Sequence, residues 1–308
     1  MKVALFGGTG FVGSYMVDAL LDGGHEPALL VREGSEQKVR RKDECRIVMG
    51  DVTDAESVRE TLSDSEAVIY LIGIIREFRR KGISYEALHF EGAKRVMNAA
   101  QELGVRRTIL MSANGVKPDG TGYQRTKYLA EQYLRTTGLD WTVFRPSLIF
   151  GDPMGKVEFC SQLRDQLIKL PFPAPLFYSG LVPRNAGKFE MSPIHVNDVA
   201  VILTKALEMK ETMGKIYELG GPDTFDWKRI IKTIGAAVGK RKWTVPAPAL
   251  GIKLVAALFD RFAFFPITRD QITMLMEGNT CDSASVFELI EIEPTPFSVE
   301  SLAYLKEQ

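Results

Sequence analysis

Short apolar runs alternate with amphipathic stretches along the first 150 residues of the chain. Each apolar run is bounded by turn residues and has the length of a buried strand. We predict strands at Lys2–Phe6, Pro27–Val31, Arg46–Met49, Ala67–Leu71, Thr108–Met111 and Trp141–Phe144. The stretches between them repeat with helical spacing, which predicts helices at Phe11–Leu21, Ala55–Leu62, Tyr85–Leu103 and Tyr123–Thr136. Such alternation implies right-handed crossovers and an α/β fold with a doubly wound parallel sheet.

The pattern changes after Gly151. We predict a helix over Lys156–Leu170, then a long loop broken by Pro171, Pro173, Pro175 and Pro183. Later elements are predicted at His195–Lys210, Ile216–Leu219 (a strand), Trp227–Val238, Leu250–Phe262, Thr268–Met276 and near Val299–Leu305. We therefore expect a first domain over residues 1–150, completed by about 193–220. A smaller, partly interleaved C-terminal α/β lid domain is expected over 151–192 and 221–308.

The bulk composition excludes several classes of protein. The 308 residues carry a formal net charge of zero, and the pI is near 6.9, so nothing indicates a nucleic-acid partner. Cys45, Cys160 and Cys281 are far apart, which excludes a disulfide framework and a zinc ribbon, and no metal site is expected. No apolar run reaches the ~18 residues of a spanning helix. We expect a cytoplasmic protein that at most lies against a membrane, and the sequence leaves its oligomeric state open.

Gly7, Gly10 and Gly13 have the spacing G-x-x-G-x-x-G between the first predicted strand and helix. One glycine permits the tight turn, one lets a pyrophosphate approach the backbone, and one lets helix and strand pack closely. The helix N-terminus offers free N–H groups to phosphates. This context favours a dinucleotide site over a plain strand-helix turn, and the predicted site includes Thr9, Phe11 and Val12 of the same turn.

The second predicted strand ends at Val31-Arg32, where a fold selective for NAD(H) usually has an acidic residue. Arginine at this position is suited to a 2′-phosphate, with Ser35 and Lys38 nearby. We therefore favour NADP(H) over NAD(H), although Glu33 is close and Arg32 is alternatively an ordinary surface residue.

Further cofactor contacts are predicted at the ends of the third and fourth strands. Asp51, followed by Val52, is placed to accept from the adenine amino group. Gly73 follows the fourth strand, where the missing side chain leaves room for the cofactor.

Tyr123 and Lys127 are four residues apart on a predicted helix and therefore share a face. A nearby cation stabilises phenolate, so we expect Lys127 to lower the pKa of Tyr123 and make it an acid/base catalyst. Ser112 ends the fifth strand and could hydrogen-bond a substrate carbonyl. The alternative is an amphipathic helix with an incidental Tyr and Lys.

These residues together resemble the extended and atypical short-chain dehydrogenase/reductase superfamily, whose members are similar to NAD-dependent epimerases and dehydratases. The resemblance covers essentially the whole chain and is carried by Gly7-x-x-Gly10-x-x-Gly13, Ser112, Tyr123-x-x-x-Lys127, Arg145-Pro146-Ser147-x-x-Phe150-Gly151 and His195-Val-Asn-Asp198-Val. Within the superfamily the chain is most similar to the branch of the nucleotide-binding accessory subunit of respiratory complex I. That similarity lies in Leu88-His89-Phe90-Glu91-Gly92-Ala93, Tyr217-Glu-Leu-Gly-Gly-Pro222, Thr268-Arg-Asp-Gln271, Glu277-Gly-Asn279 and Glu293-Pro-Thr-Pro296-Phe297.

The resemblance implies a Rossmann fold with a small C-terminal substrate domain. It implies Tyr123 as proton donor or acceptor, Ser112 as substrate anchor, and Lys127 as a contact to the nicotinamide ribose. Pro146 belongs to a matching motif and is included among the cofactor-binding residues. His89 departs from the family pattern, because active members typically carry an asparagine there. In the complex I branch the dinucleotide is thought to serve structure or assembly.

The segment Leu250–Phe265 is unusually apolar. We interpret it as a buried lid helix, or alternatively as a wall for a quinone- or isoprenoid-like substrate opposite Phe172, Phe177 and Tyr178, or as a docking surface for a membrane protein. Three functions stay open. The first is NADP(H)-dependent hydride transfer to or from a carbonyl or alcohol of a small, apolar substrate. The second is a non-catalytic accessory or assembly role in a respiratory membrane complex. The third is nucleotide-sugar epimerisation or dehydration.

Overall fold

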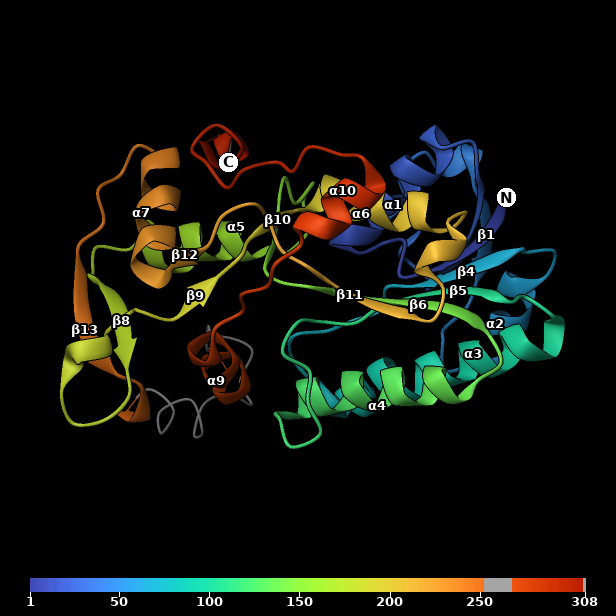
Figure 1. Cartoon of the computed structure of the whole chain (residues 1–308), viewed down its shortest axis with the longest axis horizontal. Helices are drawn as coiled ribbons and strands as arrows, with labels where there is room; N and C mark the ends of the chain where they lie inside the picture. The colour runs from blue at the N-terminus through green and yellow to red at the C-terminus, as the bar shows by residue number, and fades with distance from the viewer. Residues whose placement is uncertain (252–267, 307–308) are drawn as a thin grey trace. The chain divides into compact units, whose positions relative to one another are not determined.

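The computed structural model describes residues 1–251 and 268–306 (Figure 1). The chain divides into two compact units. The first comprises Met1–Pro146, Val196–Leu219 and Ser285–Ile292, and the second comprises Ser147–His195, Gly220–Ala284 and Glu293–Gln308. Most of the predicted helix Leu250–Phe262, and of the apolar segment around it, lies outside the described residues.

The first unit is built on a seven-stranded sheet in the order β11-β6-β5-β4-β1-β2-β3. Its strands are β1 (Lys2–Phe6), β2 (Glu26–Val31), β3 (Arg46–Met49), β4 (Ala67–Tyr70), β5 (Arg107–Met111), β6 (Asp140–Pro146) and β11 (Lys215–Leu219). Every neighbouring pair is parallel. The strand order reverses beside β1, which confirms the predicted doubly wound Rossmann fold and places a topological switch point at the end of β1.

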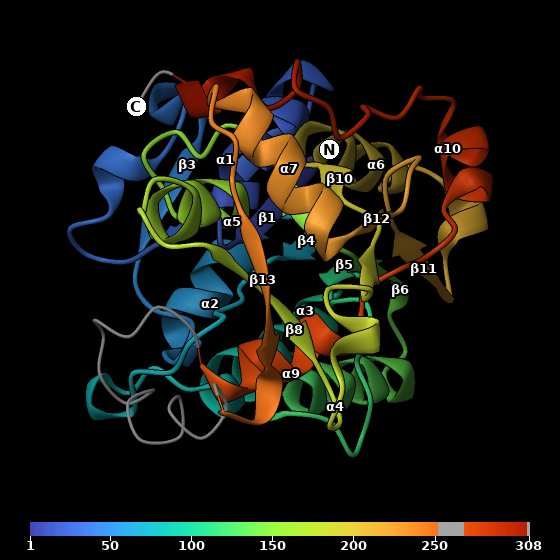
Figure 2. The same ribbon diagram turned by 90° about the vertical axis from the view of Figure 1, so that its left-hand side faces the viewer.

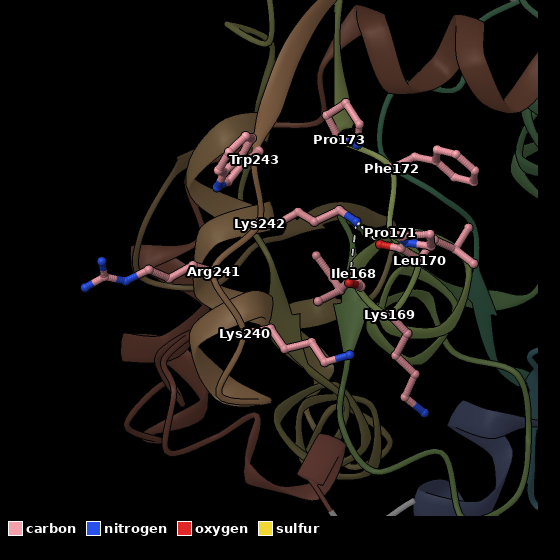
Figure 3. A pocket seen from close by; sticks show the side chains of 10 residues that line it. All are labelled: Ile168, Lys169, Leu170, Pro171, Phe172, Pro173, Lys240, Arg241, Lys242 and Trp243. Carbon is pink, nitrogen blue, oxygen red and sulfur yellow. Dashed lines mark hydrogen bonds between the residues drawn. The ribbon is translucent and has the colours of Figure 1, made fainter.

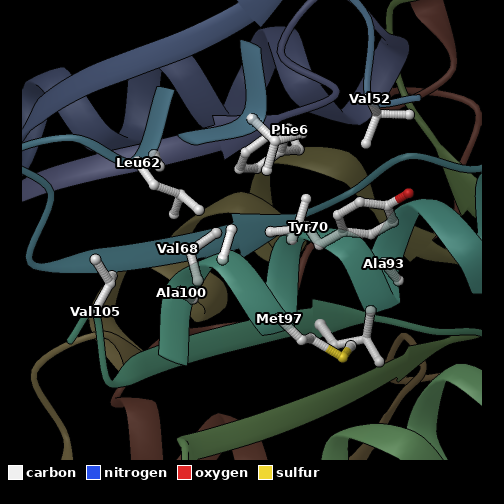
Figure 4. Close-up of a cluster of buried hydrophobic side chains, with 14 of the residues drawn as sticks. Phe6, Val52, Leu62, Val68, Tyr70, Ala93, Met97, Ala100 and Val105 are labelled. Carbon is white, nitrogen blue, oxygen red and sulfur yellow. The ribbon is translucent and has the colours of Figure 1, made fainter. Parts of the chain in front are cut away.

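Helices cover both faces of this sheet, as Figure 1 shows. They are α1 (Phe11–Asp22), α6 (Val196–Ala206) and α10 (Ala284–Ile290) on one face, and α2 (Ala55–Leu62), α3 (Gly92–Leu103) and α4 (Gly122–Thr136) on the other. Figure 4 shows the core beneath α3, where Phe6, Val68 and Met97 are buried. The predicted helix over residues 85–103 is divided, because a π-helical turn (Glu86–Glu91) precedes α3. The pattern did not predict α10, which is short.

Arg107 is a buried cation inside the first unit. Its guanidinium donates to the carbonyl oxygens of Leu207 and Asp140 at 3.0 and 2.8 Å, and to the hydroxyl oxygens of Thr142 and Thr212 at 2.9 Å. Burial lowers the pKa of Arg107 to about 10. The side chain therefore fastens β5 to the chain that follows α6, where the last helical carbonyls need donors.

The second unit has small sheets and its own core. Its elements are β7 (Ile149–Phe150), α5 (Phe159–Leu163), a π-helix (Arg164–Ile168), β8 (Ala174–Tyr178), β9 (Glu190–Met191), β10 (Ile194–His195), β12 (Phe225–Asp226), α7 (Trp227–Ala237), β13 (Thr244–Pro248), α9 (Arg269–Glu277) and a 3₁₀ turn (Ala303–Lys306). Trp227 stacks on Phe177 and Phe189 at ring-centroid distances of 6.3 and 5.7 Å. Figure 2 shows β13 beside β8, with α7 next to them.

The proline-rich segment predicted as a loop contains the strand β8, which pairs in parallel with β13. The Ala174 amide donates to the Trp243 carbonyl at 2.7 Å, so the next residue, Pro175, faces away from the partner strand and its missing N–H costs no ladder bond. The helix predicted from Lys156 starts instead at Phe159, because the Glu158 carboxylate caps it. The predicted C-terminal helix near Val299–Leu305 is only the 3₁₀ turn.

Within the described residues, no helix combines the length and apolar character required to cross a bilayer. The same residues contain no cluster of His, Cys, Asp or Glu suited to a metal ion.

We predict that Arg107→Met lowers the free energy of unfolding by about 3 kcal/mol or more, since it leaves buried carbonyls without donors. Arg106→Met is the matched control, because Arg106 is exposed and pairs only with Asp140 at the surface; we expect a change of about 0.5 kcal/mol or less. Urea unfolding followed by circular dichroism measures both. Equal losses in the two variants would contradict the structural role of Arg107.

Candidate dinucleotide and catalytic site

The turn between β1 and α1 has the geometry of an anion site. Gly7 has φ +104°, which a residue with a side chain rarely adopts. Gly10 is the N-cap of α1 and no side chain caps this helix. The amides of its first turn, which include those of Phe11, Val12 and Gly13, are therefore available to a phosphate. Thr9 lies in the same turn between β1 and α1.

Gly13 lets the backbone of α1 approach β1 closely. A Cβ at Gly13 would overlap the Gly7 carbonyl oxygen and lie 2.7 Å from the Gly8 Cα. Gly8 itself is also constrained, because its Cβ would lie 2.5 Å from a methyl carbon of Leu29. The G-x-x-G-x-x-G spacing does not include Gly8, and only its position directly after a buried strand could have indicated the constraint.

Two cations lie beyond the end of β2. Arg32 and Lys38 are exposed, and neither makes an ion pair or side-chain hydrogen bond to the described residues. Ser35 is buried, and its amide donates to the Arg32 carbonyl at 3.0 Å while its own carbonyl accepts from the Lys38 amide at the same distance. These two hydrogen bonds join the backbones of Arg32, Ser35 and Lys38. The positive side chains of Arg32 and Lys38 are thereby available to bind an external anion.

The residues after β3 are fixed by local contacts. The Asp51 Oδ1 accepts from both the amide and the hydroxyl of Thr53, at 2.9 and 2.7 Å. Val52 is buried, and its carbonyl accepts from Arg95 at 2.9 Å. The Thr53 contacts therefore fix the orientation of the Asp51 carboxylate. A fixed orientation is what a carboxylate needs to accept a hydrogen bond from the adenine amino group.

Ser112, Tyr123 and Lys127 converge at the ends of β5 and α4. The Lys127 Nζ donates to the carbonyl oxygen of Met111 at 3.0 Å, one residue before Ser112. It also lies 5.9 Å from the ring centroid of Tyr123. Ser112 is 3% exposed, and its hydroxyl oxygen has no hydrogen-bond partner in the described structure. An unsatisfied buried hydroxyl is costly, so this one is expected where a ligand supplies the partner.

Burial dominates the electrostatics of the pair. It raises the pKa of Tyr123 to about 12, which is opposite to the direction expected from Lys127 alone. Burial also lowers the pKa of the Lys127 ammonium to about 8, while Glu131 acts in the other direction. The expectation that Lys127 lowers the pKa of Tyr123 is therefore wrong for the protein by itself, because burial of the phenol alone sets the direction of the shift.

The segment after β4 connects the glycine turn with Lys127. A Cβ at Gly7 would lie 3.1 Å from the Ile72 amide nitrogen, and one at Gly73 would lie 3.5 Å from the Lys127 Nζ. The short stretch from Ile72 to Gly73 thus borders both halves of the candidate site. Pro146 ends β6, is buried, and accepts from the Asn114 amide at 2.9 Å, so it holds the loop that follows Ser112.

His89 lies in the π-helical turn and is 2% exposed. Its Nε2 accepts from the Ile74 amide at 3.0 Å, which requires the proton of the neutral ring to be on Nδ1. Nδ1 lies 3.1 Å from the Thr126 hydroxyl and is therefore the donor there. The ring also makes an edge contact with Tyr123, with centroids 5.1 Å apart. Both nitrogens are engaged, so His89 has no free position for proton transfer.

Burial, assisted by the charge of Lys127, lowers the pKa of His89 to about 2. The imidazole is neutral across the physiological range, and it joins the segment after β4 to α4. His89 thus positions Gly73 and the Tyr123 helix relative to each other. From the sequence, His89 was visible only as a departure from a family pattern. Its tautomer could not be predicted, because it depends on the Ile74 amide that donates to Nε2.

The structure bears on both halves of the expected substrate wall, the three aromatic residues near β8 and the apolar segment Leu250–Phe265. Phe177 is 5% exposed and stacks within the core of the second unit, so it is not free to line a wall. Phe172, in contrast, is 70% exposed, and Tyr178 is partly buried at the end of β8. The segment Leu250–Phe265, which was expected to form the opposite wall, lies almost wholly outside the described residues.

A family model described as NAD(P)H-binding matches residues 7–167, and the chain belongs to this family. This assignment agrees with the switch-point turn and with the uncapped start of α1. The chain is, more closely, a protein of the extended short-chain dehydrogenase/reductase type, near the branch of the complex I accessory subunit.

Individual relatives span most of the chain. The 40 kDa subunit of NADH-ubiquinone oxidoreductase from Neurospora crassa is 26% identical over 309 residues, covering 98% of this chain and 78% of that protein. A ceramide reductase of Caulobacter vibrioides is 26% identical over 263 residues, covering 85% of this chain and 78% of that protein. The structure of Thermus thermophilus UDP-glucose 4-epimerase with NAD has a TM-score of 0.74 at 18% identity, covering 100% of this chain and 98% of that one. The last similarity supports the fold alone.

We predict that the protonation of His89 makes acid destabilisation steeper. Below pH 6.5 the unfolded imidazole binds a proton while the folded one does not, because its folded pKa is lowered. Between pH 7 and pH 5 the wild type should lose about 2 kcal/mol more than His89→Asn, in which this group is absent. Urea unfolding at each pH measures the difference. Parallel pH dependence of the two proteins would exclude a buried neutral histidine.

Proposed function

We propose that the protein is an NADP(H)-dependent oxidoreductase that moves a hydride to or from a carbonyl or alcohol carbon of an apolar substrate. The observation that carries this proposal is the buried hydroxyl of Ser112, which has no protein partner. It follows directly after the carbonyl held by the Lys127 ammonium. A substrate oxygen would give this hydroxyl a hydrogen-bond partner close to Tyr123 and Lys127, which form an acid/base pair.

The described residues fit a bound dinucleotide. Gly7, Gly10 and Gly13 leave the first turn of α1 open to the pyrophosphate, and Gly73 lies beside Lys127, where a Cβ would be 3.5 Å from the Lys127 Nζ. The exposed Arg32 and Lys38 would pair with a 2′-phosphate, which favours the phosphorylated cofactor. The nicotinamide, when bound, supplies or receives the hydride.

The protein's part in the reaction follows from three side chains. The Ser112 hydroxyl donates to the substrate oxygen and holds it. The Tyr123 phenol, kept protonated at neutral pH by its raised pKa, transfers its proton to that oxygen during reduction. The Lys127 ammonium stabilises the phenolate left behind, and it contributes its full charge only below its lowered pKa of about 8. The arrangement therefore favours the reductive direction at neutral and mildly acidic pH.

The apolar substrate class rests on the names of relatives. These include an oxidoreductase subunit named for ubiquinone, a ceramide reductase and a 3-beta-hydroxysteroid dehydrogenase. Each of these names refers to a large, mainly apolar molecule. The similarity to a UDP-glucose 4-epimerase structure supports the fold alone, so we favour sugar nucleotides less.

A second candidate function is an accessory role in a membrane respiratory complex, with the dinucleotide as a structural ligand. One specific observation favours it. His89 departs from the asparagine that the family resemblance implies for active members, and because both its nitrogens are occupied it cannot relay protons. The near-complete coverage by the Neurospora crassa subunit is consistent with this role.

We predict that Tyr123→Phe lowers kcat for carbonyl reduction by about 10²-fold or more, because it removes the proton donor. Affinity for NADPH should change less than about threefold, since only a hydroxyl is lost. Tyr128→Phe is the matched control on the same helix, and its rate should equal that of the wild type. The assay follows NADPH absorbance with a long-chain ketone, a ketosteroid and a short-chain quinone.

The same assay separates the two candidate functions. NADPH that binds tightly and is oxidised by none of these acceptors would favour the accessory role. Turnover that survives Tyr123→Phe undiminished would contradict the catalytic mechanism.

We predict that Arg32→Gln weakens NADPH binding by about tenfold and leaves NADH binding unchanged, because it removes one charge-assisted contact to the 2′-phosphate. Isothermal titration with each nucleotide measures the effect. Lys42→Gln, which removes an exposed cation from the same unit, should leave both affinities as in the wild type. Equal losses for NADH and NADPH in Arg32→Gln would refute the assignment.

A further inference from the structure

A hollow on the second unit gathers basic and aromatic side chains, whereas the candidate dinucleotide site is built from residues of the first unit. It has a volume of about 500 Å³ and lies between the segments that lead into β8 and β13. Figure 3 shows Trp243 and Phe172 on its opposite walls, with Lys242 reaching between them. The Ala174 amide holds the Trp243 carbonyl at 2.7 Å, so the strand pair fixes both walls in register.

The charge of the hollow has one sign. Lys169, Lys240, Arg241 and Lys242 line it, and none of the described lining residues is acidic. Lys169 pairs at 2.9 Å with Asp165, and Lys242 donates to the Leu170 carbonyl at 2.6 Å. The side chains of Lys240 and Arg241 are exposed and make no ion pair or side-chain hydrogen bond within the described part of the chain. Because the whole chain has a net charge of zero, this positive charge is local.

The apolar side chains of the hollow are exposed to an unusual degree. Trp243 is 82%, Phe172 70% and Leu170 45% exposed. Pro171 and Pro173 flank Phe172 and restrict its backbone, so the ring is presented rather than free to fold onto the core. Exposed large rings are costly in water and normally mark a surface that is covered in use.

We propose that this basic–aromatic hollow is a docking surface for a bilayer that contains anionic lipids. Lys240 and Arg241 attract the lipid phosphates, while Trp243 and Phe172 enter the interfacial region, where aromatic rings are favoured. Trp243 and Phe172 project from opposite walls and do not form a continuous apolar face that would match a folded acidic protein. A bilayer accommodates such protrusions at no cost in shape complementarity. Exposed rings can also stack on bases, so single-stranded RNA is a competing partner in the experiment.

Sedimentation of the full chain with lipid vesicles tests the proposal. Wild-type protein should bind vesicles of phosphatidylcholine with about 30% phosphatidylglycerol at least tenfold more strongly than pure phosphatidylcholine vesicles. The double variant Lys240→Gln/Arg241→Gln should lose about tenfold or more of that binding, since each interfacial cation contributes substantially. The double variant Trp243→Ala/Phe172→Ala should also bind anionic vesicles more weakly than the wild type. This loss should be present at high salt as well as at low salt, because it removes apolar contacts and not charge.

A matched control and a competing partner complete the experiment. Lys210→Gln/Lys215→Gln removes two exposed cations of the first unit and should bind as the wild type does. Circular dichroism and NADPH affinity should be unchanged in every variant, because all substituted side chains are exposed. Equal losses in the control pair, wild-type binding by the Lys240/Arg241 variant, or binding of single-stranded RNA or polyglutamate in place of anionic vesicles would overturn the proposal.

Discussion

The approach of α1 to β1 is the constraint on which the candidate site depends. Only a residue without Cβ fits at Gly13, because the Gly7 carbonyl oxygen and the Gly8 backbone fill the space that a side chain would occupy. The helix therefore starts directly at the end of β1, where the strand order reverses. Its uncapped amides face the one edge of the sheet at which the loops after β1, β4 and β5 can share a ligand.

The chemistry adds a second constraint, which is desolvation. Lys127 and Tyr123 are close enough to interact, yet burial moves both pKa values toward the neutral forms. Burial of this kind keeps the proton on the phenol until its surroundings change, as the proposed role of Tyr123 as a proton donor requires. His89 contributes by keeping one tautomer, which joins the chain after β4 to the helix of Tyr123.

The periodicity of the sequence was sufficient for the sheet of the first unit, because buried parallel strands are continuous apolar runs between turn residues. It predicted β1 and β3 with their observed bounds and most others within a residue or two. It did not predict the role of Arg107, whose partners Leu207 and Thr212 lie about a hundred residues away. Neither local pattern nor spacing encodes such a contact.

The candidate site divides in the same way. The glycine spacing, Arg32, and the Tyr123–Lys127 pair were visible because each is defined by neighbours in sequence. Gly8 and the tautomer of His89 were not, since they depend on Leu29 and on the Ile74 amide. The direction of the Tyr123 pKa shift was also mistaken, because a spacing of four residues specifies a charge nearby but not the loss of water around it.

The prolines of the β8–β13 pair have a consequence for association. Pro175 faces outward, and the register turns Pro246 and Pro248 outward on the other strand. Neither outer edge can offer a complete row of N–H groups to another strand, and the Pro175 carbonyl is already taken by the indole nitrogen of Trp227 at 2.9 Å. An edge strand with a complete row of free N–H and C=O groups could otherwise pair with strands of neighbouring molecules. This small sheet can hold exposed aromatic rings at one end and still resist growing into an aggregate.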